Sequence, residues 1–142
     1  MAVGIIKNLY DTDFALWAEH TAELIRSGRF EAVDLEHVAE EIEDMGRRDL
    51  RELSSRLERT LEHALKLRLV GGVDHARNER GWRASMARQQ SNIQGLLAQS
   101  PSLRRRIPEL MAGAYSAAAR VVTIEYDVTA PAECPWTAEE LL

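Results

Sequence analysis

The longest helix-permissive stretch of the chain runs from Asp34 to Leu69; it contains no proline, and its only internal helix breaker is Gly46. A straight helix of this length extends over about 54 Å, at about 1.5 Å per residue. A compact chain of 142 residues has a diameter of only about 40 Å. The stretch therefore either bends near Gly46 or extends from the globule and packs against another chain.

Apolar residues follow helical spacing on both sides of Gly46. The residues before it are Leu35, Val38, Ile42 and Met45, and those after it are Leu50, Leu53, Leu57, Leu61, Ala64 and Leu65. The step of five residues from Met45 to Leu50 shifts the phase of the stripe. This slip predicts a bend, or a change of packing partner, at residues 45–49.

The remaining apolar patterns also predict helices. A first helix begins after the capping residues Asp11 to Asp13, presents Phe14 and Trp17 as core anchors, and ends at Ser27-Gly28. Residues 73–79 are expected to form a loop before a third helix over residues 82–99. Pro101 begins a short turn over residues 101–106. A fourth helix begins near residue 107 and buries the apolar side chains Leu110, Met111, Ala114, Ala117, Ala118 and Val121.

These elements predict an all-α fold, a bundle of about four helices with a long second helix and a short C-terminal tail. We expect one domain over residues 1–142, with an N-terminal arm at residues 1–10 and a docking tail at residues 127–142. Thr137 and Glu140 in the tail have the spacing of a capping box. Trp136 is expected to pin the tail to the bundle.

Composition favours a soluble cytoplasmic protein. Apolar residues make up 45% of the chain, enough for a hydrophobic core. Cys134 is the single cysteine, so no disulfide forms within the chain. No apolar stretch is long enough for a membrane span, and the N-terminus has no convincing signal peptide.

Charge is strongly segregated along the chain. Residues 1–45 carry eleven acids and three bases, residues 46–120 carry seven acids and fifteen bases, and residues 121–142 carry five acids and no base. The net charges of −8, +8 and −5 sum to the total of −5. Either the acidic ends fold back onto the basic middle, or the middle presents a basic surface to an acidic partner.

Several local patterns together resemble a bacterial family catalogued as domain of unknown function 29. They are Tyr10 to Phe14 with Trp17, Gly28 to Phe30 with Asp34-Leu35, Glu40 to Gly46, His63 with Leu65-Lys66, Trp82, Ser100 to Leu103, Tyr115, and Cys134 to Trp136. The chain departs from the family pattern at residues 67–72 and at Gly81. The resemblance implies a helical fold and a bacterial origin, and it implies no activity.

The function favoured by the sequence is that of a protein-interaction module, with a homodimer or another protein as its partner and no cofactor. The long second helix supplies its candidate residues, which are Leu50, Leu53, Leu57, Leu61, Arg47 and Arg51. The seam would be apolar, and charge would set its partner and register.

Two other function classes have candidate residues. Nucleic-acid binding would use an arginine-rich face near Trp82 as a stacking ring, formed by Arg77, Arg80, Arg83, Arg104, Arg105 and Arg106. A metal-dependent enzyme would use His37 with Glu40 and Glu41, which share one helix face at spacings of three and four. His63 is expected to be partly buried and hydrogen-bonded, and a nucleophilic Cys134 is not expected because no histidine lies near it in the sequence.

Overall fold

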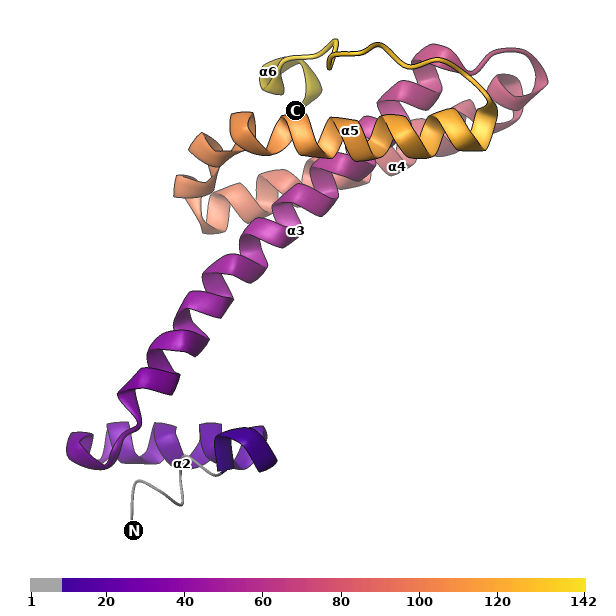
Figure 1. The fold of residues 1–142 in the computed structure, drawn as a ribbon. Helices are drawn as coiled ribbons and strands as arrows, with labels where there is room; N and C mark the ends of the chain where they lie inside the picture. The colour runs from indigo at the N-terminus through magenta and orange to yellow at the C-terminus, as the bar shows by residue number, and fades with distance from the viewer. Residues whose placement is uncertain (1–8) are drawn as a thin grey trace. The chain divides into compact units, whose positions relative to one another are not determined.

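The protein, seen in a computed structural model that describes residues 9–142, is built from helices (Figure 1). In chain order these are α2 (Phe14–Arg26), η1 (Phe30–Ala32), α3 (Leu35–Leu69), α4 (Gly72–Gln99), η2 (Pro101–Arg106), α5 (Ile107–Tyr126) and α6 (Ala138–Leu141). Residues 9–142 contain no β-strand, which confirms the all-α prediction. Residues 9–12 form a helical turn before α2. The rest of the predicted N-terminal arm lies outside the described residues.

The chain divides into two compact units, one ending at Arg47 and the other spanning Arg48–Leu142. The sequence predicted a single domain, and the division falls inside α3. This helix is continuous through Gly46, where a Cβ atom would meet nothing within 4 Å. Of the two alternatives predicted for residues 45–49, the change of packing partner is the one that matches the boundary between the units along this continuous helix.

The N-terminal unit packs α2 and η1 against the first turns of α3. Asp13 caps α2 as predicted, since its Oδ1 accepts a hydrogen bond from the Leu16 amide at 3.1 Å. Gly28, at φ +75°, provides the left-handed conformation that ends the helix. Trp17 is buried as predicted, but Phe14 is 49% exposed; its ring lies tilted against that of Trp17, with the centroids 5.5 Å apart.

The C-terminal unit buries the second half of α3 against α4 and α5 (Figure 1). The inward face of α5 carries Ile107, Met111, Ala114, Ala118 and Val122, each one helical turn from the next. Val121, which the sequence placed in the core, is 40% exposed, whereas Val122 is fully buried. The regular four-residue step from Ala118 reaches Val122, and that spacing decides which valine faces inward.

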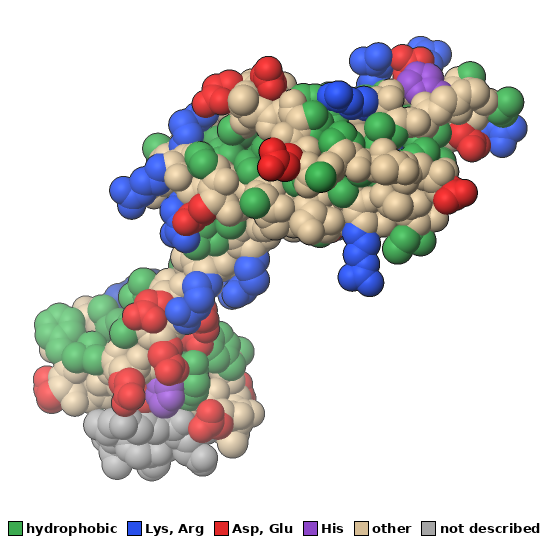
Figure 2. Space-filling model, turned by 45° about the horizontal axis from the view of Figure 1, so that its top comes forward, with side chains coloured by type: hydrophobic (Ala, Val, Ile, Leu, Met, Phe, Trp, Pro, Cys, Tyr) green, Lys and Arg blue, Asp and Glu red, His purple; other side chains and the backbone are tan. Residues whose placement is uncertain are grey.

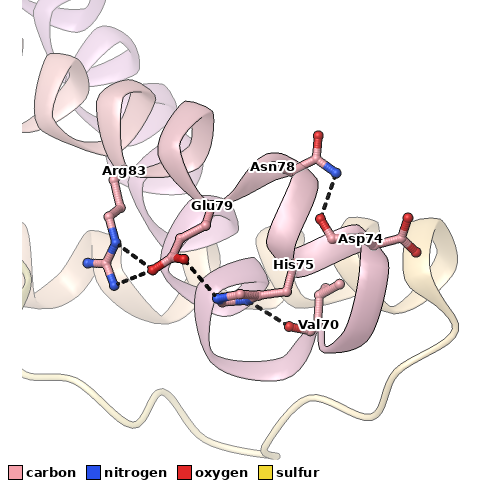
Figure 3. Close-up of polar contacts among 6 residues, drawn as sticks. All are labelled: Val70, Asp74, His75, Asn78, Glu79 and Arg83. Carbon is pink, nitrogen blue, oxygen red and sulfur yellow. Dashed lines mark hydrogen bonds and ion pairs between the residues drawn. The ribbon is translucent and has the colours of Figure 1, made fainter.

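Helix α4 begins ten residues before the predicted third helix, and the predicted loop at residues 73–79 is helical. The polar segment carries no apolar stripe, so its helical character rests on polar contacts one turn apart (Figure 3). Asn78 Nδ2 donates to the Asp74 carbonyl at 2.8 Å, and Arg83 donates to Glu79 at 3.0 Å. His75 Nδ1 lies 2.9 Å from the Val70 carbonyl oxygen, which joins the start of α4 to the end of α3.

The tail after α5 lies against the C-terminal unit. The Tyr115 hydroxyl donates to the Pro131 carbonyl at 2.6 Å, and Gln90 Nε2 donates to the Leu141 carbonyl at 2.6 Å. Trp136 packs against the core, and Thr137 begins α6 with the capping box that the sequence predicted. Among the described helices, none has the length and apolar character needed to cross a bilayer.

Candidate functional site

One face of α3 can be followed from the N-terminal unit into the C-terminal unit. Leu35, Ile42, Gly46, Leu53 and Leu57 lie seven, four, seven and four residues apart along the continuous helix. These steps keep the residues on one face, since seven residues complete about two turns. Gly46 occupies a position on this face without contributing a side chain. The apparent phase slip therefore arises because sequence reasoning traced the stripe through Met45.

In the C-terminal unit this face is buried in the chain's own core. Leu53, Leu57 and Leu61 are each 0% exposed, and Leu50 is half-buried beside them. The sequence had placed these leucines in a seam with another chain, but Leu53, Leu57 and Leu61 keep no exposed surface for a partner, and Leu50 keeps only part of its own. Arg47 is held by Asp44 at 2.6 Å and by Glu43 at 3.5 Å. Arg51 is exposed.

In the N-terminal unit the same face stays open. Leu35 is 66% exposed and Ile42 is 62% exposed, and Met45 beside them is 60% exposed. Ala39 and Gly46 between and after them are exposed as well. We call Leu35, Ala39, Ile42, Met45 and Gly46 the open α3 face.

The exposure of apolar side chains is concentrated in this unit. Ten large apolar side chains are exposed among residues 9–142, and seven of them precede Arg47: Phe14, Leu16, Ile25, Phe30, Leu35, Ile42 and Met45. Figure 2 shows apolar side chains gathered on the surface of the N-terminal body. Single exposed apolar residues are ordinary, whereas seven among residues 9–46 set this unit apart from the C-terminal unit.

A polar cluster fixes the first turns of α3 against the turn that precedes α2. The Tyr10 hydroxyl donates to Glu41 at 2.6 Å, which raises the pKa of Tyr10 to about 12. The Tyr10 ring stacks on His37 at 3.9 Å. His37 Nδ1 lies 2.5 Å from a carboxylate oxygen of the buried Asp34, and this hydrogen bond raises the pKa of His37. The cluster holds the open α3 face in position.

The same contacts engage the residues that the sequence offered as metal ligands. His37 pairs with Asp34 and Glu41 accepts from Tyr10, while Glu40 is exposed. Within residues 9–142, no group of three or more histidine, cysteine or acidic side chains is placed to hold a metal ion.

The arginines proposed for nucleic-acid binding fall into two groups. Arg83 pairs with Glu79 at 3.0 Å, and Arg106 pairs with Glu109. Arg77, Arg80, Arg104 and Arg105 are exposed, and the described residues offer no ion pair to any of them. Trp82 is 7% exposed and packs edge-on against Tyr126, so its ring is not free to stack on a base.

Two further features of the C-terminal unit could be read as chemistry. A groove of about 490 Å³ lies between α5 and the tail, lined mainly by Met111, Tyr115, Pro131 and Cys134. The Cys134 thiol donates to the Trp136 carbonyl. His63 is partly buried as predicted, but its Nδ1 is buried with no partner within the described residues. Burial, with Lys66 nearby, lowers the pKa of His63.

Comparison with known proteins gives a family and no closer relative. The family model described as domain of unknown function DUF29 matches residues 9–142. No curated protein and no solved structure matches the chain significantly. The match takes in both compact units, from the Tyr10 cluster to the end of the tail, and the chain belongs to the DUF29 family.

Proposed function

We propose that the protein is a helical interaction module that self-associates through the open α3 face. The observation that carries the proposal is the change of burial along one helix face. Leu53 and Leu57 are fully buried, whereas Leu35 and Ile42 are 66% and 62% exposed. A face that is apolar along its whole length but covered over only half of it has the character of an unfilled helix–helix contact.

The small core of the N-terminal unit supports the proposal. Its buried apolar cluster consists of Trp17, Leu24 and Val33, with partly buried neighbours around them. The Trp17 indole nitrogen and the Thr21 hydroxyl are also buried without hydrogen-bond partners in the described part of the chain. The unit spans Met1–Arg47, which is close to the size of about 40 residues below which a domain usually needs a disulfide, a metal or oligomerisation for stability. Self-association would supply the burial that this unit lacks.

A second copy of the chain is the partner that best fits this face. Two identical faces related by a twofold axis would place Ile42 near Ile42 of the other chain, because such an interface uses the same patch on both subunits. The small residues Ala39 and Gly46 would let the two helix backbones approach closely. The N-terminal segment is strongly acidic, so the association has to be driven by apolar burial and opposed by charge.

This balance of forces gives a specific salt dependence. Repulsion between two acidic units is screened as salt rises, since the Debye length falls from about 30 Å at 0.01 M to about 3 Å at 1 M. Apolar burial is not weakened in this way. The dimer is therefore expected to tighten with sodium chloride, whereas a complex with a basic protein would loosen.

The test is light scattering on a size-exclusion peak, over loading concentrations from about 1 to about 100 μM, because mass action makes the dimer population depend on concentration. The double variant Leu35→Glu/Ile42→Glu should give a monomer, with the helical circular dichroism of the parent chain. The matched control is Val73→Glu/Ile124→Glu, whose side chains are 73% and 75% exposed in the C-terminal unit. The control should keep the parent oligomer.

Three results would contradict the proposal. The parent chain could be a monomer at every concentration and salt. Both double variants could remain dimeric, which would place the interface elsewhere. The two variants could also dissociate the dimer equally, which would show that added negative charge and not the open α3 face is responsible.

A further inference from the structure

The surface of α4 and η2 carries a strongly one-sided positive charge. Between His75 and Pro108 there is one acid, Glu79, against seven arginines: Arg77, Arg80, Arg83, Arg88, Arg104, Arg105 and Arg106. That acid is already paired, since the Arg83 guanidinium donates to the Glu79 carboxylate at 3.0 Å (Figure 3). His75 Nε2 also lies 3.6 Å from a Glu79 carboxylate oxygen. Arg106 is likewise paired, with Glu109. Five arginines are left whose charge no described acid balances through an ion pair.

Three of these five arginines share one face of α4. Arg80 and Arg88 follow Arg77 by three and eleven residues. At about 100° per residue, the three side chains lie within about 80° of one another around the helix axis. All three are exposed. The residues on the same face are small and exposed, namely Gly81, Ala84, Ser91 and Gly95. We call Arg77, Arg80, Arg88 and these small residues the arginine face of α4; Val73 lies at its start, and only small side chains lie between Arg80 and Arg88 on it.

The other two arginines continue the charge beyond the end of α4. Arg104 and Arg105 lie in the second turn of η2, which packs against α4, and both are exposed. Figure 2 shows arginine and lysine side chains extending from the surface of the C-terminal unit. Guanidinium groups bind phosphate oxygens through paired hydrogen bonds, and arginine keeps its charge at any physiological pH.

From this arrangement we infer that the arginine face of α4, together with Arg104 and Arg105, binds the phosphate backbone of a double-stranded nucleic acid without reading its sequence. The burial of Trp82, the aromatic ring that lies on α4 among these arginines, argues for a duplex, because single-strand binders stack bases on exposed aromatic side chains. The chain as a whole is acidic, so binding has to be local to this surface and weak, in the range of about 10⁻⁴ to 10⁻⁶ M typical of sequence-independent complexes.

Counterion release sets the size of the effect. The logarithm of the binding constant falls with the logarithm of salt concentration by about 0.9 for each phosphate neutralised. Five arginines give a slope of about −4.5, which is a loss of about 500-fold in affinity from about 50 to about 200 mM salt. The triple variant Arg77→Gln/Arg80→Gln/Arg88→Gln keeps two contacts, so its slope should be about −1.8 and its loss about 12-fold.

The experiment is fluorescence anisotropy of a labelled duplex DNA of about 20 base pairs, titrated with the full chain across this salt range. A control of equal charge change is Arg26→Gln/Arg51→Gln/Arg120→Gln, since these arginines are exposed and carry no ion pair within the described residues. The inference requires that the α4 triple variant lowers the slope while the control keeps it. The monomeric Leu35→Glu/Ile42→Glu variant, measured alongside, separates this surface from self-association because it leaves all five arginines in place.

Several outcomes would overturn the inference. The parent chain could fail to bind duplex DNA even at about 50 mM salt, or both triple variants could lower the slope equally, which would reflect total charge alone. Binding of polyglutamate, but not of DNA, through the same three arginines would assign the face to an acidic protein. Stronger binding to single-stranded than to duplex DNA would contradict the argument from Trp82.

Discussion

Two substitutions on the same face of α3 should have very different effects on stability. Leu57 is 0% exposed, and Ile42 is 62% exposed. Leu57→Ala removes a fully buried side chain and leaves a cavity, which typically lowers the free energy of unfolding by about 2.7 to 5 kcal/mol. Complete burial of an isoleucine side chain contributes about 1.5 to 3 kcal/mol, and only about 0.4 of the Ile42 side chain is covered. Ile42→Ala should therefore lower the free energy of unfolding of the monomer by at most about 1 kcal/mol, less the gain from alanine's higher helix propensity.

Urea unfolding followed by far-ultraviolet circular dichroism measures both differences. It should be done at about 1 μM protein, where self-association contributes little. The dependence of the free energy on urea should be unchanged in both variants, because neither alters the surface exposed on unfolding. At about 100 μM the difference in stability between the parent chain and the Ile42→Ala variant should grow, because the variant then also loses dimer contacts.

Either of two results would refute the reasoning. Leu57→Ala could lower the free energy of unfolding by less than about 1 kcal/mol, which would show that the leucine is not packed within its own chain. Ile42→Ala could instead be as destabilising as Leu57→Ala at about 1 μM, which would mean that its face is covered in the monomer.

Four further outcomes are expected. Gly46→Ala should raise the thermal midpoint, because a Cβ atom there meets nothing within 4 Å and alanine favours an interior helical position by up to about 1 kcal/mol. His63 has a lowered pKa in the fold, so stability should fall as pH drops below the unfolded-state pKa of about 6.5, and His63→Gln should reduce that loss in urea titrations between about pH 7 and 5. The raised pKa of His37 has the opposite sign, since its pairing with Asp34 stabilises below about pH 6.5 and is lost as pH rises through the folded pKa; His37→Gln should flatten this part of the profile. Hydrogen exchange of α2 should slow as protein concentration rises, whereas exchange of α5 should not change.

The sequence predicted well wherever a regular apolar stripe decides the structure. The stripe of α3 after Gly46, the start of α5 at Ile107 and the capping box at Thr137 all follow from spacing and capping chemistry. It failed at the start of α4, where polar residues form a helix through contacts one turn apart and give no periodic apolar signal. Spacing also failed to decide between Val121 and Val122. The sequence predicted that Val121 is buried, whereas Val121 is exposed and Val122, the next residue, is buried.

The candidate sites were harder to predict than the fold, for a physical reason. Periodicity shows that a helix face is apolar, but it does not show whether the chain itself covers that face. Leu35 and Leu53 have the same character in the sequence, and only the packing of α4 and α5 against one of them separates core from open surface. The arginines pose the same problem, because Arg80 and Arg83 differ only in whether Glu79 lies one turn away on the helix.

The distribution of burial along α3 is the physical basis of the proposed interaction function. The C-terminal unit satisfies its apolar surface internally, with leucines at 0% exposure and a tail hydrogen-bonded across the bundle. The N-terminal unit does not, since it buries polar atoms of Trp17 and Thr21 that find no partner among the described residues, and it leaves Leu35, Ile42 and Met45 open. The first turns of α3 are held within this unit by the hydrogen bond from Tyr10 to Glu41 and by the pairing of His37 with Asp34. Selection for stability alone would replace open apolar side chains with polar ones, so their presence on a well-supported helix is best explained by a partner that covers them.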